Sequence, residues 1–494
     1  MSCLSVEKRM GAAMRKKIVV VGTGVGGAAI AALLSKKGFA VTVFERNNFE
    51  GGKAASYERD GFTCDMGVHF TARGSNGPLG EVARLVDADL KFSEPNPVMR
   101  IRTPSRQHDF SQNLLSPISL LKQILVTRVQ LRNFPGAFRV FLQILRIREE
   151  RDVTPHDATI LRDFLLRYTD DEGFHRLINI FSGLLFVIPT EEASAGEFLW
   201  SYASMTRTKS LGYPMGGFGR IARSYLEACT QMGGSVCLQE SVQSIRVENG
   251  NVSGVVTDKG AYDADFVISN AGIKKTIALA GENQFPASYV SRSRNLSDSL
   301  GAVSIKYALD RPPFDIPIVT YMPEDLNWSQ NMEMMLRGEV PEDIPLFLPC
   351  PTFCDPSLAP SGKHILLAGT AVPADLSMSN MAEKILDLME KRIPELFPGI
   401  EKHIIWKHRT NLSYIDRMGG RGAGEVIGLA QSHDQTGKNK PDPRTPVQGL
   451  YLVGCDAGGR GVGTEQAADS ALKVSALIEK SEIKTNGFSH VAGS

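Results

Sequence analysis

Apolar residues near the start of the chain change their pattern over a short distance. Ile18 to Val21 is a continuous apolar run of strand length, and an Ala- and Leu-rich helix is predicted to follow it. A glycine-rich turn, Gly22 to Gly27, separates the two, and a second apolar strand is predicted from Ala40 to Phe44. The order strand, turn, helix, strand predicts a Rossmann-like α/β unit.

The residues of this turn have the properties that a dinucleotide diphosphate requires. Gly22 permits the tight bend, Gly24 has no Cβ to block the phosphates, and the helix start offers free N–H groups to an anion. Glu45 ends the second strand at the offset expected for a carboxylate that accepts ribose hydroxyls. The predicted diphosphate contacts are Gly22, Gly24, Val25, Gly26 and Gly27.

A second glycine pair follows the acid. Glu45 is followed by Arg46 and, a few residues later, by Gly51-Gly52-Lys53, which a unit that binds NAD does not need. This pattern resembles the FAD-binding signature of the amine oxidase and phytoene desaturase superfamily. The resemblance implies FAD as the cofactor and adds Arg46, Gly51, Gly52 and Lys53 to its binding residues.

Further motifs of that superfamily occur along nearly the whole chain and in the same order. Val242 looks like the valine whose backbone meets the adenine, and the segment around Asn270 looks like the end of the next strand. The matching segments are 60–67, 213–219, 233–245, 268–271 and 355–360.

The C-terminal motif resembles the flavin end of the site. An apolar strand from Gly449 ends at Gly454 and Asp456, and a glycine loop then leads into a helix. In the family the aspartate holds the ribityl and diphosphate region, and N–H groups here at Val462 and Gly463 face the flavin N1 and O2. Reduction places negative charge there, which a helix N-terminus stabilises.

The same loop departs from the carotenoid desaturases, which usually carry a proline-containing glycine loop. Residues 458–466 read GGRGVGTEQ instead. The difference does not affect the resemblance to the family. Because this loop borders the substrate face of the flavin, however, the particular reaction stays open.

The cofactor motifs lie at both ends and in the middle of the chain, so one discontinuous cofactor domain is predicted. We expect an inserted α+β substrate domain and a helical lid. The predicted segments are 15–104, 211–297 and 406–482 for FAD, 105–210 for the lid, 298–405 for the substrate domain, and 1–14 as a disordered extension.

Composition excludes some classes of function. Lysine and arginine total 55 against 54 acids, so nothing favours nucleic acid. The seven cysteines are scattered, which favours reduced thiols in a cytoplasmic protein, and no zinc spacing occurs, so no metal is predicted. No apolar run is long enough to span a membrane.

One segment favours peripheral contact with a membrane. Between Ser111 and Arg148 six cations and no acid are interleaved with Leu, Ile, Val and Phe. A basic amphipathic helix suits an anionic surface on the inner face of a membrane. The alternative is a lid helix that covers a substrate tunnel, and the apolar segment 178–189 is predicted as core or tunnel lining.

The candidates for acid–base work are His69 and Glu465. His69 follows the turn that the family places near the flavin, and Glu465 stands in the first turn of the flavin-facing helix. The alternatives are a structural hydrogen bond for His69 and a complement to the helix dipole for Glu465. For Arg73 and Arg460 we expect surface ion pairs rather than contacts with a phosphate.

The sequence therefore predicts an FAD-dependent oxidoreductase that acts on carbon–carbon bonds of a long apolar, isoprenoid or carotenoid-like substrate, with desaturation as the first choice. Saturation and isomerisation of a polyene are alternatives, followed by a flavin amine oxidase and a non-enzymatic prenyl-lipid escort protein. The electron partner is external: quinone, oxygen, a redox protein or transient NAD(P)H.

Overall fold

A computed structural model describes residues 15–489, apart from 68, 115, 117, 123–128, 325, 420 and 421, and it describes side chains up to residue 481. The predicted extension, residues 1–14, lies outside this range. Among the residues described, no helix combines the length and the apolar character needed to cross a bilayer.

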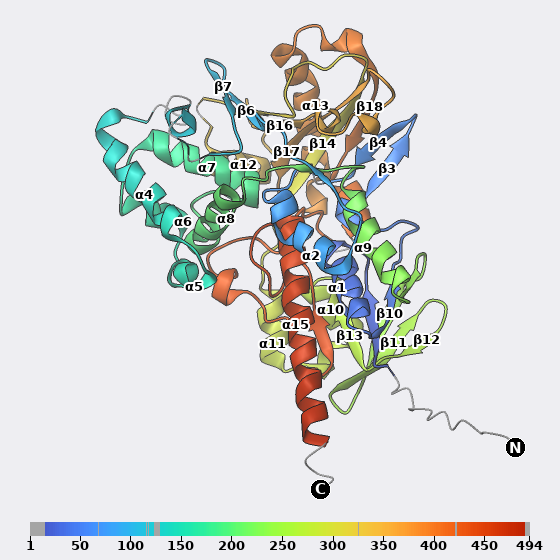
Figure 1. The fold of residues 1–494 in the computed structure, drawn as a ribbon. Coiled ribbons are helices and arrows are strands. Elements are labelled where there is room, and N and C mark those ends of the chain that lie inside the picture. Colours follow the sequence, from blue (N-terminus) through green and yellow to red (C-terminus); the bar gives the residue numbers. More distant parts are fainter. Residues whose placement is uncertain are drawn as a thin grey trace, which may run out of the picture.

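A five-stranded parallel sheet forms the lower half of the molecule in Figure 1. Its order is β19 (Leu450–Leu452), β13 (Phe266–Ser269), β1 (Lys17–Val21), β2 (Ala40–Phe44) and β9 (Ser235–Cys237). These strands come from three distant parts of the sequence, and all the pairings are parallel. The predicted α/β class is confirmed.

Alternation along β1 explains how both faces of this sheet are covered. Ile18 and Val20 pack into a core with α1 (Val25–Lys36), α2 (Pro78–Val86), α9 (Gly219–Gln231) and α15 (Gly463–Ser489). Val19 and Val21 face the opposite core. That core includes α10 (Ile273–Ala280), α11 (Ala287–Arg294) and a second sheet of β10 (Val242–Glu248), β11 (Asn251–Thr257) and β12 (Ala261–Asp263).

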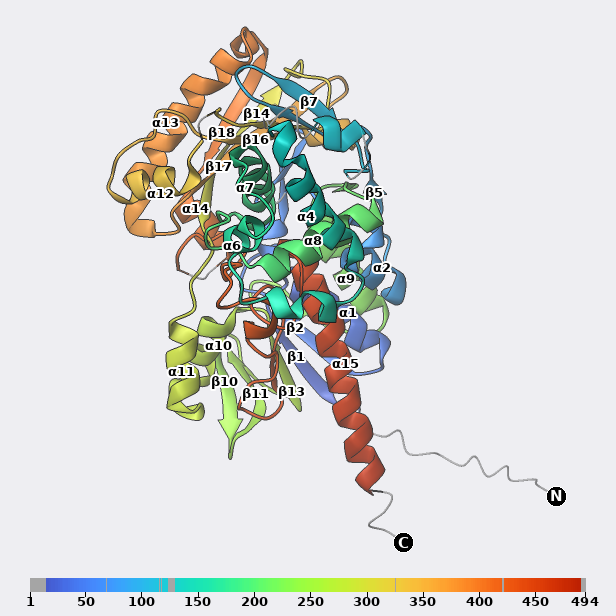
Figure 2. The same ribbon diagram turned by 90° about the vertical axis from the view of Figure 1, so that its left-hand side faces the viewer.

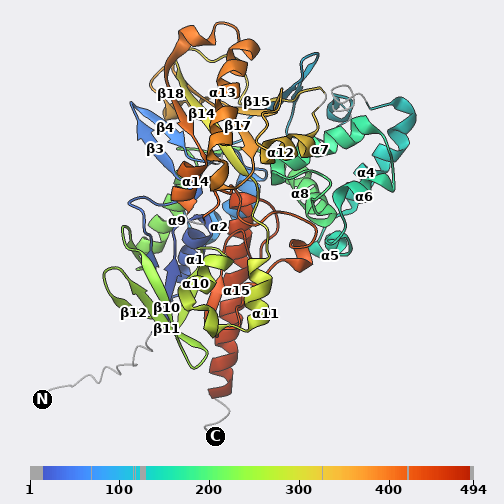
Figure 3. The same cartoon turned by 180° about the vertical axis from the view of Figure 1, so that it is seen from behind.

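A seven-stranded, mostly antiparallel sheet forms the upper half. Its order is β18 (Ile404–Thr410), β14 (Gly301–Leu309), β17 (His364–Val372), β16 (Leu346–Pro349), β15 (Ile318–Tyr321), β6 (Met99–Arg102) and β7 (Gln107–Phe110). One face packs on α13 (Ser379–Leu396). Figure 3 shows two further helices beside this sheet, α12 (Trp328–Leu336) and α14 (Leu412–Gly419).

Helices gather beside this sheet and share a separate apolar core. They are α4 (Phe134–Arg146), α5 (Glu150–Val153), α6 (Leu161–Leu166), α7 (Glu172–Phe186) and α8 (Ala195–Thr208). Figure 2 shows them in front of the sheet, while α15 runs down past α1. We call this group the helical insert.

Two strands of this sheet differ from the division into segments that the sequence predicts. The β7 strand falls in the segment 105–210 that was expected to be helical, but it pairs with β6 and so extends the seven-stranded sheet. The β18 strand crosses the predicted boundary at 405 because it pairs with β14 through Thr410. The hairpin of β6 and β7 joins this sheet because β6 pairs with β15, and β18 joins it through β14, so partners far away in the sequence place both strands.

The basic segment is not one long helix. Residues 118–122 are helical, residues 123–128 lie outside the described residues, and α4 begins only at Phe134. Arg128 therefore cannot be placed. Lys122 donates a hydrogen bond to the Asp109 carbonyl oxygen, at 2.9 Å, whereas Arg139 on α4 is exposed.

Two buried carboxylates, Asp65 and Asp355, connect the recognised motifs through hydrogen bonds. Asp65, at the end of the hairpin of β3 (Ser56–Arg59) and β4 (Phe62–Asp65), accepts hydrogen bonds from the Tyr213 hydroxyl and the Phe218 N–H. Asp355 accepts one from the Gly216 N–H. The segment between β8 (Tyr213–Pro214), which pairs with β5 (Phe92–Ser93), and α9 is thus fixed from two directions.

Candidate functional site

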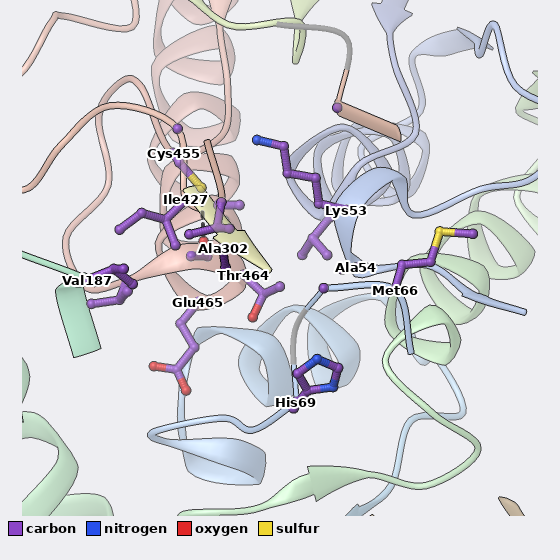
Figure 4. A pocket seen from close by; sticks show the side chains of 18 of the residues that line it. Lys53, Ala54, Met66, His69, Val187, Ala302, Ile427, Cys455, Thr464 and Glu465 are labelled. Carbon is purple, nitrogen blue, oxygen red and sulfur yellow. Dashed lines mark hydrogen bonds between the residues drawn. The ribbon is translucent and has the colours of Figure 1, made fainter. Parts of the chain in front are cut away.

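A cavity of about 640 Å³ lies where the two large sheets and the helical insert meet. It begins at the glycine turn after β1 and passes the start of α15. Figure 4 shows Lys53, Ala54, Met66 and His69 on one side of it, with Cys455, Thr464 and Glu465 on the other. All the predicted cofactor residues line this cavity except Gly27 and Asp456, and both catalytic candidates line it too.

Steric limits explain the glycines of the turn. A Cβ on Gly27 would lie 2.0 Å from the Gly22 carbonyl oxygen, so only glycine lets α1 pack this closely on the turn. A Cβ on Gly24 would lie 2.5 Å from Asn270 Nδ2. Gly22 itself has φ of +93°, a conformation that side chains rarely adopt. The turn thus leaves an open cradle beside the amide of Asn270, which also lines the cavity.

The Glu45 carboxylate is fixed before any ligand arrives. Oε2 accepts hydrogen bonds from the Thr23 N–H at 2.9 Å and the Thr23 hydroxyl at 2.8 Å, and Oε1 accepts two from Asn47. Glu45 is nearly buried, yet it lines the cavity. Carboxylate oxygens have lone pairs beyond these four bonds, so the group can still accept ribose hydroxyls.

The second glycine pair forms a short 3₁₀ turn, Gly52–Ala54, that begins after Gly51 with φ of +99°. The Lys53 amine that follows forms an ion pair with the buried Glu425. Arg46 donates to the Arg417 carbonyl oxygen on α14, at 2.5 Å. These cations hold α14 against the cavity, while the glycines leave room beside Gly24.

Asp456, predicted to hold the ribityl and diphosphate region, does not line the cavity. Its carboxylate accepts hydrogen bonds from the Ile273 N–H, at 3.0 Å, and from the Leu429 N–H, at 3.4 Å. It therefore caps the start of α10. Gly454 lines the cavity and, with φ of +111°, turns the chain from β19 toward α15.

Arg73 and Glu465 form a buried pair inside the cavity wall. Glu465 accepts hydrogen bonds from the Arg73 N–H at 2.6 Å and from Arg73 Nε at 2.7 Å, and both residues are less than a tenth exposed. The expectation of a surface ion pair for Arg73 is wrong. Low exposure and close contact of opposite charges make this pair a fixed feature of the α15 start.

The expectation of a surface ion pair is wrong for Arg460 as well. Its guanidinium bonds Asp157 at 2.8 and 3.0 Å and Glu197 at 3.2 Å, and neither carboxylate has exposed side-chain area. The Gly461 N–H also donates to Glu197, at 2.6 Å. Arg460 thus fastens the glycine loop before α15 to the helical insert.

His69 lines the cavity and stays neutral at ordinary pH. Burial, together with the nearby Lys306 cation, lowers the pKa of His69 to about 3. Its partial exposure is to the cavity rather than to open solvent. A neutral imidazole can donate one hydrogen bond and accept one, but it lacks the second proton that an imidazolium could transfer to a substrate.

Lys306 is a buried cation that sequence reasoning missed. It lies on β14 with 1% of its surface exposed, and its amine donates to the Thr410 hydroxyl at 3.0 Å. Burial lowers the pKa of Lys306 to about 8. A single lysine in the apolar strand GAVSIKYAL was the available signal, but strand alternation would place it on either face.

Beyond the cofactor residues the cavity becomes apolar. One wall is the face of the seven-stranded sheet opposite α13, where Ile318, Met322 and Phe347 line it. The other wall is α7 with Phe181 and Leu184. The segment 178–189, predicted as core or tunnel lining, thus supplies several lining residues.

Comparisons with known proteins agree on a family. A family model described as flavin containing amine oxidoreductase matches residues 25–478. Prolycopene isomerase of Daucus carota is 26% identical, with 92% of this chain and 80% of the relative covered. The zeta-carotene-forming phytoene desaturase of Myxococcus xanthus is 24% identical, with 89% of each covered.

Solved structures share the fold. An oxidoreductase from Methanosarcina mazei superposes with a TM-score of 0.71 at 23% identity, over 93% of this chain and 99% of that one. Putrescine oxidase bound to putrescine superposes with a TM-score of 0.67 at 13% identity, over 94% and 99%. At such identities the likeness establishes the architecture alone.

Proposed function

Because this chain belongs to the flavin-containing amine oxidoreductases, we propose that it is an FAD-dependent enzyme that oxidises carbon–carbon bonds of a long apolar, carotenoid-like substrate. The carrying observation is the continuous cavity, which passes from the glycine turn to an apolar space between α7 and the seven-stranded sheet. Relatives named as carotenoid desaturases and isomerases support this substrate class.

The residues present suit FAD in particular. Glu45 would hold the adenosine ribose, the turn at Gly24 the diphosphate, Val242 the adenine, and the α15 start at Gly463 the flavin ring. When bound, the flavin accepts or gives a hydride at N5. The chain's own part is to orient both ligands and keep water out.

Charge in the cavity argues against a cationic amine as substrate. Among the described lining residues the carboxylates are Glu45 and Glu465, and each is already engaged by N–H donors, Glu465 by the Arg73 cation as well. Among the described lining residues there is also no tyrosine to form an aromatic cage. These features favour a neutral apolar substrate over amine oxidation.

We propose distinct tasks for the two catalytic candidates. His69, neutral and facing the cavity, orients the substrate through a hydrogen bond. Glu465 positions the Arg73 guanidinium beside the α15 start. The helical insert acts as a lid over the cavity, and Arg460 links this lid to the glycine loop before α15.

We also propose that α4 contacts an anionic membrane, the source of an apolar substrate. Phe134 and Phe138 are 38% and 42% exposed, with ring centroids 6.0 Å apart, and Leu145 is exposed on the same helix. Arg139 and Arg146 are exposed beside them. An apolar stripe flanked by cations is the pattern of a helix that lies in the interface of a bilayer.

Absorbance of the purified protein tests the cofactor proposal. Protein expressed or refolded with ample FAD is expected to be yellow and to show bound flavin after gel filtration. Colourless protein under these conditions would favour the alternative of a prenyl-lipid escort without a working flavin site.

A further inference from the structure

The apolar end of the cavity contains polar atoms that no protein group satisfies. The Trp328 indole Nε1 and the Thr320 hydroxyl oxygen are both buried without a hydrogen-bond partner, and both residues line the cavity. Thr320 is 1% exposed and Trp328 is 8% exposed. A third such atom, the Ser201 hydroxyl on α8, belongs to the helical wall.

Strand order places this end far from the predicted flavin residues. Thr320 lies on β15, and the order β14, β17, β16, β15 puts three strand spacings between it and the β14 strand. At the usual spacing this is about 14 Å. The β14 strand is the one that approaches the Met66 carbonyl beside His69. Thr320 is thus remote from the reacting end.

Trp328 lines the same cavity, at its helical wall. A Cβ on Gly183 would lie 3.1 Å from Trp328 Cζ3, so the indole packs directly on α7 where that helix has no side chain. Figures 1 and 3 both show α12 beside α7. The lining neighbours of Thr320 along the chain are Ile318 on β15 and Met322 just after it, whose side chains offer no hydrogen-bond donor.

Unpartnered polar atoms in an apolar cavity are costly, because each loses its water without compensation. A ligand oxygen removes that cost. The indole N–H can only donate, and the threonine hydroxyl can donate or accept, so an acceptor oxygen satisfies both. A pure hydrocarbon satisfies neither.

We propose that Thr320 and Trp328 form a subsite for an oxygen atom, a hydroxyl or a carbonyl, at the remote end of the apolar substrate. This inference rests on the proposed function and narrows its substrate class from hydrocarbons to oxygenated polyenes. The oxygen fixes how far the chain slides into the cavity and therefore which carbon–carbon bond reaches the flavin.

Binding of a matched ligand pair to the flavin-loaded enzyme tests the subsite. The probes are an acyclic polyene hydrocarbon and its terminal monohydroxy derivative of the same length, titrated by the shift in polyene absorbance. Wild type is expected to prefer the hydroxylated polyene by about tenfold or more. Thr320→Val and Trp328→Phe each reduce that preference by about 3- to 10-fold and leave hydrocarbon affinity within about twofold.

Two control variants isolate the subsite. Trp406→Phe removes an indole N–H that is also unpartnered but does not line the cavity. Thr71→Val removes a lining hydroxyl that already donates to the Gly212 carbonyl oxygen. Neither control is expected to change the preference between the probes.

Three outcomes would overturn the inference. Equal wild-type affinity for both probes, with both oxidised, removes the subsite but leaves the proposed function standing. Variants that weaken both probes equally give Thr320 and Trp328 a purely structural role. If neither polyene binds or reduces the flavin, the proposed function fails, and the subsite with it.

Discussion

At the scale of single residues, the two glycines of the diphosphate turn differ in what limits them. A Cβ on Gly27 would meet a backbone carbonyl oxygen, whereas a Cβ on Gly24 would meet only the movable amide of Asn270. Gly24→Val is therefore expected to abolish flavin binding with the fold retained. Gly27→Val is expected to lower the free energy of unfolding by about 1 to 3 kcal/mol or more.

Flavin absorbance and urea unfolding of both variants check this difference. Gly260→Ala serves as the control, because the nearest atom to a Cβ there lies 3.9 Å away. Full flavin occupancy in Gly24→Val would contradict the assigned cradle.

Lys306 gives a prediction about pH. Its pKa falls from 10.5 in the unfolded chain to about 8 in the fold, so burying it costs about 3 kcal/mol at pH 7. This cost shrinks as the pH rises from 8 to 10.5, where the unfolded chain also loses the proton. Lys306→Met is thus expected to raise the free energy of unfolding at pH 7 by about 1 to 3 kcal/mol, and by less at pH 10.

Urea unfolding at the two pH values, taken as the difference from wild type, measures this effect. The His69 pKa provides a second check, since removal of the Lys306 cation raises it. A variant that is clearly less stable than wild type at pH 7 would mean that hydrogen bonds of Lys306 outweigh its desolvation.

His69 is expected to act without changing its charge. General acid–base catalysis typically contributes about 10²- to 10⁴-fold, but a histidine with a pKa of about 3 is a neutral imidazole at neutral pH and has no imidazolium proton to transfer. His69→Ala is expected to slow turnover by about tenfold or less and to keep the flavin bound. A larger loss, with a kcat profile that follows one ionisation near pH 6.5 in wild type, would restore the role of proton carrier.

At the scale of elements, α4 carries the proposed membrane contact. A variant with Phe134→Ser and Phe138→Ser is expected to lose flotation with anionic liposomes, because it removes the exposed stacked rings. Replacing Arg139 and Arg146 with glutamine is expected to remove the preference for anionic over neutral lipid. Leu336→Ser, at a more exposed apolar site on α12, is the control. Unchanged flotation of both α4 variants would assign α4 to covering the cavity alone.

The junction between α15 and the helical insert depends on Arg460. Arg460→Met leaves Asp157 and Glu197 buried without their cation, and it is expected to cost about 3 to 5 kcal/mol of unfolding free energy. Arg294→Met breaks an exposed pair with Glu282 and is expected to cost about 1 kcal/mol or less. Equal effects in thermal or urea unfolding would contradict the role of Arg460 as a buried fastening.

Local sequence signals explain which parts of the site could be predicted. The turn from Gly22 to Gly27, Glu45 and the start of α15 are set by neighbours in sequence, and the predicted cofactor residues among them, except Gly27, line the cavity. The cap that Asp456 forms on α10, the buried Lys306 and the pairing of β6 with β15 depend on distant partners. The periodicity of apolar residues and the amino-acid composition carry no information about such partners.

At the scale of the whole molecule, four apolar cores meet around one cavity that joins the cofactor residues to an apolar space. The five-stranded sheet supplies the dinucleotide turn, and the seven-stranded sheet and the helical insert supply the apolar walls. Architecture alone does not decide between carbon–carbon and carbon–nitrogen oxidation, because putrescine oxidase has the same fold. The lining residues decide it, and they favour an apolar neutral substrate.

Anaerobic reduction of the bound flavin tests this account most directly. The oxidised enzyme is mixed in the absence of oxygen with a panel of long polyenes, their more saturated partners and short amines, and flavin absorbance and product mass are followed together. The account predicts bleaching of the flavin by a long apolar substrate and a product lighter by two hydrogens. Bleaching by short polar amines alone, with the polyenes unchanged, would contradict it.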